Sequence, residues 1–244
     1  KEHITTIMAH FKGRVSAWDV CNECFEDDAS PRKSLFWQIL GTDYIPLAFQ
    51  YAHDADPTAE LYYNDFNVWR KGHVDGIVTM VKRLQSEGIR IDGVGIQAHW
   101  GLNFPKTEYI EHAIDTLASC GVKVMITELD VDVLPLTREG QIIGQSMSEP
   151  QFQLEEWEEY LDPYKEGLPE DVARQLDARY EELFRIFYKH RDQIDRVTFW
   201  GLADSDSWKN GYPVPRRTNY PLLFNRDYSA KPCVEAILRI PEEN

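Results

Sequence analysis

Short apolar runs and amphipathic stretches alternate along most of this chain. The apolar runs are rich in β-branched and aromatic residues and have the length of buried strands, which predicts strands at 15–21, 61–63, 91–96, 122–127 and 197–201. Between them, apolar residues recur at helical spacing, which predicts helices at 1–11, 45–53, 74–84, 109–117, 169–190 and 231–239. The helices are long enough to cross over between strands, so the pattern is typical of a parallel sheet in an α/β fold.

Residues 134–168 interrupt this alternation. The stretch has neither a helical nor a strand period, and its acidic centre at 155–159 has glycine and proline on both sides. We predict a long excursion between a strand and the next helix. Excursions of this length in a compact domain are usually functional or mobile.

Each predicted strand is followed closely by polar or aromatic side chains. Because the carboxyl ends of parallel strands open onto one face, these side chains should line a single cleft. Any one acid among them, taken alone, is better explained as a solvated loop residue, but their joint occurrence favours a site. The residues concerned are Asn22, Glu23, Asn64, Asn67, Gln97, His99, Glu128, Asp130 and Trp200.

Two of these residues, Glu23 and Glu128, are glutamates at the ends of different strands. Cleavage of a glycosidic bond ordinarily takes two carboxyl groups, one on each side of the bond. The two must hold different protonation states at one pH, so their surroundings have to differ. The pair predicts glycosidic bond cleavage, provided that the fold brings the two residues together.

Charge and composition exclude several classes of partner. The chain has 26 basic and 41 acidic residues and a net charge of −15, and no basic cluster interrupts the acidity. Nucleic acid and anionic membranes bind to basic clusters, so neither is expected as a partner. No apolar run approaches the roughly 18 residues of a membrane span. Residues 1–6 lack the basic and apolar regions of a signal peptide.

No metal or cofactor is expected, because two-carboxylate hydrolysis needs none and no cluster of ligand residues demands one. Four cysteines in 244 residues are too few for a disulfide scaffold. Cys21 and Cys24 form a C-x-x-C motif, but Cys21 lies in a predicted strand rather than at the helix start that a redox motif uses. This placement disfavours a redox or metal role.

Five segments, in order, resemble motifs of the glycoside hydrolase family 10 xylanases. Residues 18–23 (Trp-Asp-Val-Cys-Asn-Glu) resemble the acid/base motif, and residues 124–131 (Val-Met-Ile-Thr-Glu-Leu-Asp-Val) resemble the nucleophile motif. Three supporting motifs match at 64–67, 91–99 and 221–228, and the resemblance runs from residue 1 to about 240. It implies a TIM (β/α)8 barrel and an endo-1,4-β-xylanase that acts on xylan or xylo-oligosaccharides.

The resemblance also implies roles for individual residues. Glu23 would protonate the leaving oxygen and then activate water, and Glu128 would attack the anomeric carbon, with net retention. The two carboxyl groups should then lie about 5 to 5.5 Å apart. His99 and Asp130 match the residues that keep the nucleophile ionised and oriented, although His99 could also be a core histidine bonded to a backbone carbonyl.

The sugar contacts follow from the same resemblance. Asn22 would donate to the sugar 2-hydroxyl, a contact that strengthens in the transition state. The implied substrate-binding residues are Asn64, Asn67, Gln97, Trp200 and Trp208. Trp200 and Trp208 would form an aromatic wall for the apolar face of the sugar, although a lone tryptophan more often serves packing.

This chain departs from the family pattern at several points. Cys21 stands where valine is usual, and Phe66 stands where tyrosine is common. The acid/base strand is the fourth of eight in the family and the first visible here, so we expect 1–244 to be one partial catalytic domain. It would begin in the helix before strand 4 and lack the first three βα units. Five strands cannot close a barrel, so we expect this chain alone to be poorly stable.

Two rival functions stay open at this point. The chain could belong to another retaining β-glycanase of the same barrel clan, such as a β-1,4-glucanase. It could also be a non-catalytic carbohydrate-binding relic, if the incomplete barrel leaves the cleft unassembled. The family resemblance implies a secreted or cell-envelope-associated protein.

Overall fold

The computed structural model describes residues 1–134, 162–212 and 217–243. Most of the predicted acidic excursion at 134–168 lies outside these ranges. The described residues form two compact units by their contacts. Unit 1 comprises residues 1–98, 107–128 and 190–198, and unit 2 draws on the ranges 99–106, 129–189 and 199–244. Each unit is described by itself, and the prediction of a single domain stays a prediction.

The structure confirms the five predicted strands. They are β1 (Ala17–Asn22), β2 (Glu60–Asp65), β3 (Gly93–Ile96), β5 (Lys123–Asp132) and β6 (Ile194–Phe199). The pairs β1–β2, β2–β3 and β3–β5 are parallel, and β6 also pairs with β5. A short further strand, β4 (His99–Gly101), pairs in parallel with the second half of β5 and was not predicted. The sheet therefore has the parallel βα order that the sequence pattern indicates.

The bounds of all five strands differ from the predicted ones by one or more residues, and the differences at β5 and β6 bear on the site. β5 continues to Asp132 rather than ending at 127, because its first half pairs with β3 and its second half pairs with β4. Glu128 and Asp130 thus lie within the strand instead of after it. β6 starts at Ile194 and ends at Phe199, so Trp200 follows the strand directly.

The predicted helices are confirmed as well. They are α1 (Glu2–Phe11), α3 (Tyr44–Ala55), α4 (Lys71–Ser86), α5 (Thr107–Ala118), α8 (Glu170–Lys189) and α9 (Pro232–Arg239). An additional helix, α2 (Leu35–Leu40), begins where the Ser34 hydroxyl accepts a hydrogen bond from the Trp37 amide. Short 3-10 turns follow at 41–43, 204–206, 208–210 and 240–242.

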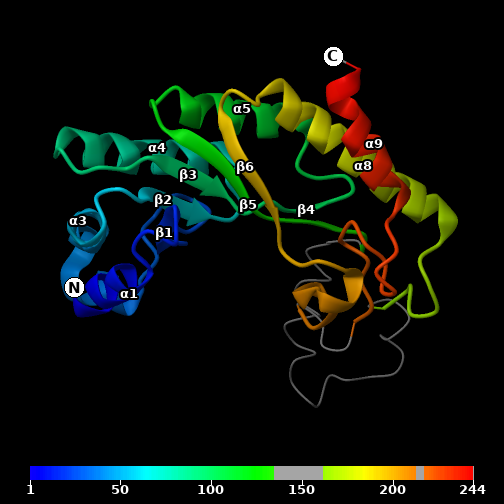
Figure 1. Cartoon of the computed structure of the whole chain (residues 1–244), viewed down its shortest axis with the longest axis horizontal. Coiled ribbons are helices and arrows are strands. Elements are labelled where there is room, and N and C mark those ends of the chain that lie inside the picture. The colour runs from blue at the N-terminus through cyan, green and yellow to red at the C-terminus, as the bar shows by residue number, and fades with distance from the viewer. Residues whose placement is uncertain (135–161, 213–216, 244) are drawn as a thin grey trace. The chain divides into compact units, whose positions relative to one another are not determined.

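The core of unit 1 lies between its strands and helices α3, α4 and α5. Figure 1 shows α4 and α5 side by side, next to β3. Leu61 and Val94 on the strands are fully buried, as are Val81 and Leu84 on α4 and Leu117 on α5. Complete burial of side chains of this size contributes about 1.5–3 kcal/mol each.

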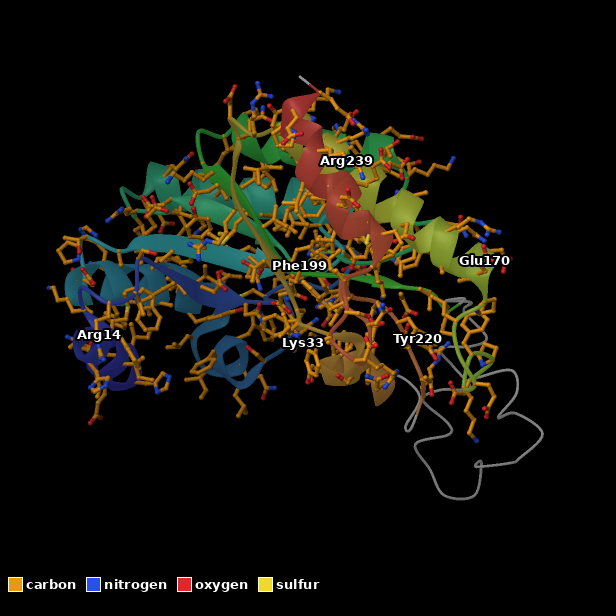
Figure 2. All side chains as sticks on the ribbon, turned by 45° about the vertical axis from the view of Figure 1, so that its right-hand side comes forward. Arg14, Lys33, Glu170, Phe199, Tyr220 and Arg239 are labelled. Atoms are coloured by element: carbon orange, nitrogen blue, oxygen red, sulfur yellow. The ribbon has the colours of Figure 1, made fainter. Side chains whose placement is uncertain are left out.

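Unit 2 is organised around α8. Figure 2 shows α9, labelled at Arg239, lying along α8, whose first residue Glu170 is also labelled. Tyr180 and Leu183 on α8 are fully buried, and the ring of Phe184 stacks on that of Phe199 at a centroid distance of 5.9 Å. The apolar stripe predicted for this helix therefore faces the core of unit 2.

A buried ion pair joins the turn at 204–206, which follows β6, to the start of α9. Lys231 Nζ lies 2.9 Å from Asp204 Oδ2 and donates to the carbonyls of Tyr220 and Leu222 at 2.9 and 2.6 Å. Asp204 is fully buried and Lys231 is nearly so. Removing one partner of such a pair leaves a buried charge uncompensated.

We predict that K231M lowers the free energy of unfolding by about 3–5 kcal/mol. Urea unfolding of the protein that contains this chain measures this loss. K82M, at an exposed position on α4, is the control and should stay within about 0.5 kcal/mol of the parent. The double variant K231M/D204N has no uncompensated buried charge. Its loss of unfolding free energy should therefore be smaller than the sum of the losses in the two single variants. Additive losses would contradict the ion-pair account.

Candidate active site

Four strands of unit 1 bring their polar residues to one edge of the sheet. Asn22, the last residue of β1, pairs with Asn64 on β2. The amide of Glu23 donates to the Asn64 carbonyl at 2.9 Å, and the amide of Glu128 donates to the Gln97 carbonyl at 3.0 Å. These backbone hydrogen bonds fix the register of the strand ends. The five side chains of Asn22, Glu23, Asn64, Gln97 and Glu128 therefore lie close together.

The same five side chains form one hydrogen-bonded chain. Asn64 Nδ2 donates to Glu128 Oε1 at 2.8 Å and to Asn22 Oδ1 at 2.9 Å. Gln97 Nε2 donates to Glu23 Oε1 at 3.0 Å and to Asn22 Oδ1 at 3.3 Å. The two glutamates that lie far apart in the sequence are thus linked through three amide side chains.

Asn64 is held in a single orientation by residues that the sequence reading did not single out. Thr127 Oγ1 donates to Asn64 Oδ1 at 2.6 Å, which leaves the amide nitrogen directed at Glu128 and Asn22. Gly95 makes room for this side chain, since a Cβ there would lie 2.4 Å from Asn64 Oδ1 and 2.7 Å from Thr127 Cγ2. The space that a side chain at position 95 would need is therefore filled by Asn64 and Thr127.

Glu23 has a backbone φ of 53°, in the left-handed region that few non-glycine residues adopt. Arg32 Nη1 lies 2.8 Å from Glu23 Oε2, and the guanidinium also lies over the ring of Phe66 at 5.3 Å. Arg32 comes from the loop after β1 and was not predicted. Its sequence does carry a signal: Arg32 and Lys33 are two adjacent cations at the end of the otherwise acidic loop 23–33.

The pKa of Glu23 is lowered from its usual value. Burial by itself raises this pKa, but the hydrogen bonds from Gln97 and Arg32 and the positive charge of Arg32 lower it further than burial raises it. The direction is opposite to the one that a general acid needs. It suits the ionised form that acts as a base.

A buried hydrogen-bonded network holds the backbone just after Glu23. The amide of Cys24 donates to the Tyr63 hydroxyl at 3.0 Å, and that hydroxyl donates to Asp65. His73 Nε2 lies 3.1 Å from the same Asp65 oxygen, and Tyr63, Asp65 and His73 are all fully buried. Because a buried polar network is costly to distort, it fixes the path of the chain on the far side of Glu23.

The structure does not bring Asn67 into the hydrogen-bonded chain of amides and glutamates. Its side-chain amide donates to Asp27 at 2.8 Å, and Arg70 lies 2.8 Å from the other oxygen of the same carboxylate. The backbone of Asn67 has a φ of 53°, and this turn directs the side chain toward the loop that carries Asp27.

A second group of predicted residues comes together within unit 2. His99 Nδ1 lies 3.0 Å from Asp130 Oδ2, and Trp208 Nε1 donates to the same oxygen at 2.9 Å. The rings of His99 and Trp208 meet edge to face at 5.0 Å. Asp130 is fully buried, so its charge is stabilised by these partners rather than by water.

Lys209 is a functional candidate that the sequence reading missed. Its ammonium lies 3.7 Å from Asp130 and 3.5 Å from Asp132, and all three side chains are buried. Asn219 donates to the other oxygen of Asp132 at 2.9 Å. A lysine in a polar loop gives no sequence signal of burial, because its position depends on the turn at 208–210.

The two predicted tryptophans differ in their surroundings. Trp208 stacks on Tyr212 at a centroid distance of 5.2 Å and is about one-third exposed. Trp200 is 48% exposed, and its backbone amide donates to the Leu129 carbonyl at 3.1 Å. Both retain aromatic surface that a sugar ring could cover.

Within the ranges that the structure describes, no group of three or more acidic, histidine or cysteine side chains is arranged to hold a metal ion. None of the helices found in those ranges is long and apolar enough to span a membrane.

Comparison with known proteins decides the family. The family model described as "Glycosyl hydrolase family 10" matches residues 1–240. This chain belongs to glycosyl hydrolase family 10. The match to the family model covers nearly the whole chain, and the strands have the parallel βα order. Together these findings establish the fold class as part of a TIM (β/α)8 barrel.

Two relatives of this chain and one solved structure that is similar to it are named as xylanases. It is 42% identical over 242 residues to endo-1,4-beta-xylanase A of Xylanibacter ruminicola, covering 98% of this chain and 63% of that protein. It is 40% identical to an endo-1,4-beta-xylanase of Geobacillus stearothermophilus, covering 98% and 67%. A solved endoxylanase from a sugarcane soil metagenome superposes with a TM-score of 0.88 at 43% identity, covering 98% and 66%. The chain thus spans about two thirds of the length of these proteins.

We predict that G95A displaces Asn64 from Glu128, because the added methyl group would occupy the space of the Asn64 amide. Overpacking of this kind costs about 1–3 kcal/mol of stability, and we expect at least a tenfold loss in any glycosidase kcat of the protein that contains this chain. Steady-state kinetics measures the loss. G72A is the control, since a Cβ at Gly72 meets nothing within 4 Å. Unchanged kinetics in G95A would contradict the role given to Asn64.

Proposed function

We propose that this chain carries the catalytic pair of an endo-acting, retaining β-1,4-xylanase. The observation that supports this most directly is the hydrogen-bonded chain that joins Glu23 to Glu128 through Gln97, Asn22 and Asn64. The names of the relatives point to xylan as the substrate class. Xylan is a polymer too large to enter a cell intact, so we also propose that the protein acts outside the cytoplasm.

In the first step of the proposed reaction, Glu128 attacks the anomeric carbon while Glu23 protonates the leaving oxygen. The bond between sugar and leaving group breaks, and a glycosyl-Glu128 ester forms. The hydrogen bond from Asn64 Nδ2 to Glu128 Oε1 orients the attacking carboxylate. Asn22 Oδ1 accepts bonds from both Asn64 and Gln97, so its Nδ2 is the group that would donate to the sugar 2-hydroxyl.

In the second step, Glu23 takes a proton from water, which attacks the anomeric carbon and releases Glu128. The lowered pKa of Glu23 supports this step, since the carboxyl must then be ionised. Gln97 donates to Glu23 in the free protein and holds it in place for both roles. Two displacements at the same carbon give net retention.

The residues grouped in unit 2 have proposed roles of their own. We assign His99 and Asp130 to the support of the nucleophile, as the family resemblance implies. The Asp130 carboxylate fixes which nitrogen of His99 carries a proton, because Nδ1 faces that carboxylate. Trp200 and Trp208 provide aromatic surface for sugar rings.

The test of the proposed function is E23A. We expect kcat on xylan to fall by at least a thousandfold, because both proton transfers are lost. Azide should restore part of the activity toward an aryl xyloside with an activated leaving group, since that substrate needs no acid and azide replaces the activated water. Equal rates of xylan hydrolysis before and after the change would overturn the proposal.

The same preparation separates the rival functions. A β-1,4-glucanase would hydrolyse carboxymethylcellulose faster than xylan, and a binding relic would hydrolyse neither while still retaining a xylan affinity that E23A leaves unchanged.

We further predict that R32M raises the pKa of Glu23, because the positive charge and the hydrogen bond of Arg32 lower this pKa in the parent protein. Glu23 would then stay protonated to a higher pH, and the alkaline limb of kcat/KM should move to higher pH. The pH profile of kcat/KM measures this shift. K33M, at the exposed neighbouring cation, is the matched control. A shift of the alkaline limb toward lower pH would contradict the account.

A further inference from the structure

Two thiols flank the acid/base glutamate. Cys21 lies near the end of β1 and Cys24 follows Glu23, so the C-x-x-C motif encloses Asn22 and Glu23. Both cysteines are free and buried. Each thiol shifts the pKa of the other, and Cys24 Sγ lies 3.8 Å from the Asn22 carbonyl oxygen. The left-handed backbone at Glu23 turns the chain between the two cysteines, an arrangement that the strand prediction did not anticipate.

The two thiols have unlike surroundings. The pKa of Cys24 is lowered by the hydrogen bond from Cys21 and by the hydroxyls of Tyr44 and Tyr63, which together outweigh burial and the charge of Asp65. The pKa of Cys21 is raised by its hydrogen bond to Cys24 and by burial. Cys24 is therefore the thiol that ionises first, and the thiolate is the form that reacts with oxidants.

Cys24 also has a route to small molecules. It lines a cavity of about 470 Å³ within unit 1, between the loop after β1 and helix α4. Phe25, Trp37, Tyr44 and Met80 form much of the wall, so the cavity is mostly apolar. A molecule the size of hydrogen peroxide fits easily in this volume.

We propose that Cys21 and Cys24 are a redox-active dithiol that closes to a disulfide across Asn22 and Glu23 when a peroxide is present. The Cys24 thiolate attacks one peroxide oxygen, the O–O bond breaks, and the departing hydroxide takes a proton to give water and a sulfenic acid at Cys24. The Cys21 sulfur then attacks the Cys24 sulfur, the S–O bond breaks, and a second water leaves. Two thiols and one hydrogen peroxide give one disulfide and two waters.

The disulfide would act on the site through the backbone. Glu23 is tied by Gln97 and Arg32 at its carboxylate and by the bond from the Cys24 amide to Tyr63 just after it. Covalent closure of the two flanking residues moves the ends of this short segment, and the glutamate between them must shift. The consequence for activity rests on the proposed function. Formation of the bond itself does not.

The experiment treats the full protein with hydrogen peroxide and maps its peptides without reduction. The peptide that holds both cysteines should lose the mass of two hydrogens, and dithiothreitol should restore it. Activity toward an aryl xyloside should fall at least tenfold on oxidation and return on reduction. C21V lacks the resolving thiol, so dimedone should label Cys24 there, and its activity should not recover with dithiothreitol after prolonged oxidation. C24A should resist peroxide.

Several outcomes would overturn the dithiol proposal. One is a fully reduced Cys21–Cys24 pair under conditions that oxidise Cys120, and another is the absence of a dimedone label on Cys24 in peroxide-treated C21V. Disulfide formation with no change in activity would overturn only the effect of the disulfide on the site. C120S/C233S should behave like the parent protein. An absence of xylanase activity in the reduced parent would count against the proposed function instead, because the peptide map reports the disulfide independently of turnover.

Discussion

The side-chain amide of Asn64 is the contact on which the arrangement of the candidate active site depends. It joins three strands, since it donates to Glu128 on β5 and Asn22 on β1 from its own position on β2. Thr127 fixes which end of the amide faces the carboxylate. Asn64 is almost fully buried, and a hydrogen bond to a charged group contributes about 1.5–3 kcal/mol in such surroundings. Without this amide, the register of the strands would still place Glu128, but its carboxylate would lose its orientation.

The proposed acid/base residue, Glu23, depends on a different kind of support. Glu23 adopts a left-handed backbone conformation that costs about 1–3 kcal/mol, and such conformations persist only where the surroundings enforce them. The enforcing groups are the Asn64 carbonyl before it and the Tyr63–Asp65–His73 network after it. Phe66 contributes through its ring, which lies under the Arg32 guanidinium. Phe66 lacks the hydroxyl of the tyrosine that is common at this position in the family, but its ring still makes the stacking contact with Arg32.

Hydrophobic periodicity was sufficient to predict the main strands and helices, because most of them bury one face in a core. It failed for α2, whose apolar residues Leu35, Phe36 and Ile39 are 73%, 67% and 77% exposed and so do not follow a core-facing pattern. It also failed for β4, which has only three residues and exists because β5 is long enough to pair with it.

The candidate site was predictable where a polar residue follows a strand, as with Asn22, Glu23, Asn64 and Gln97. Arg32 and Lys209 were not predictable in this way, since the partners of a loop cation are set by the path of the loop. Asn67 also follows a strand, yet its side-chain amide donates to Asp27 rather than to the glutamates. Its role in sugar binding stays a prediction. Strand position therefore predicts which residues reach the edge of the sheet, while loop conformation decides which of them turn toward the glutamates.

The most direct measurement is covalent trapping of the proposed nucleophile. The protein is incubated with a 2-deoxy-2-fluoro-xylosyl donor carrying an activated leaving group, which forms the glycosyl-enzyme quickly and releases it slowly, and the labelled peptide is identified by mass spectrometry. The account predicts one fluoroxylosyl group on Glu128, with no label in E128A. A label on Glu23, or hydrolysis of the donor with inversion and no trapped intermediate, would contradict it.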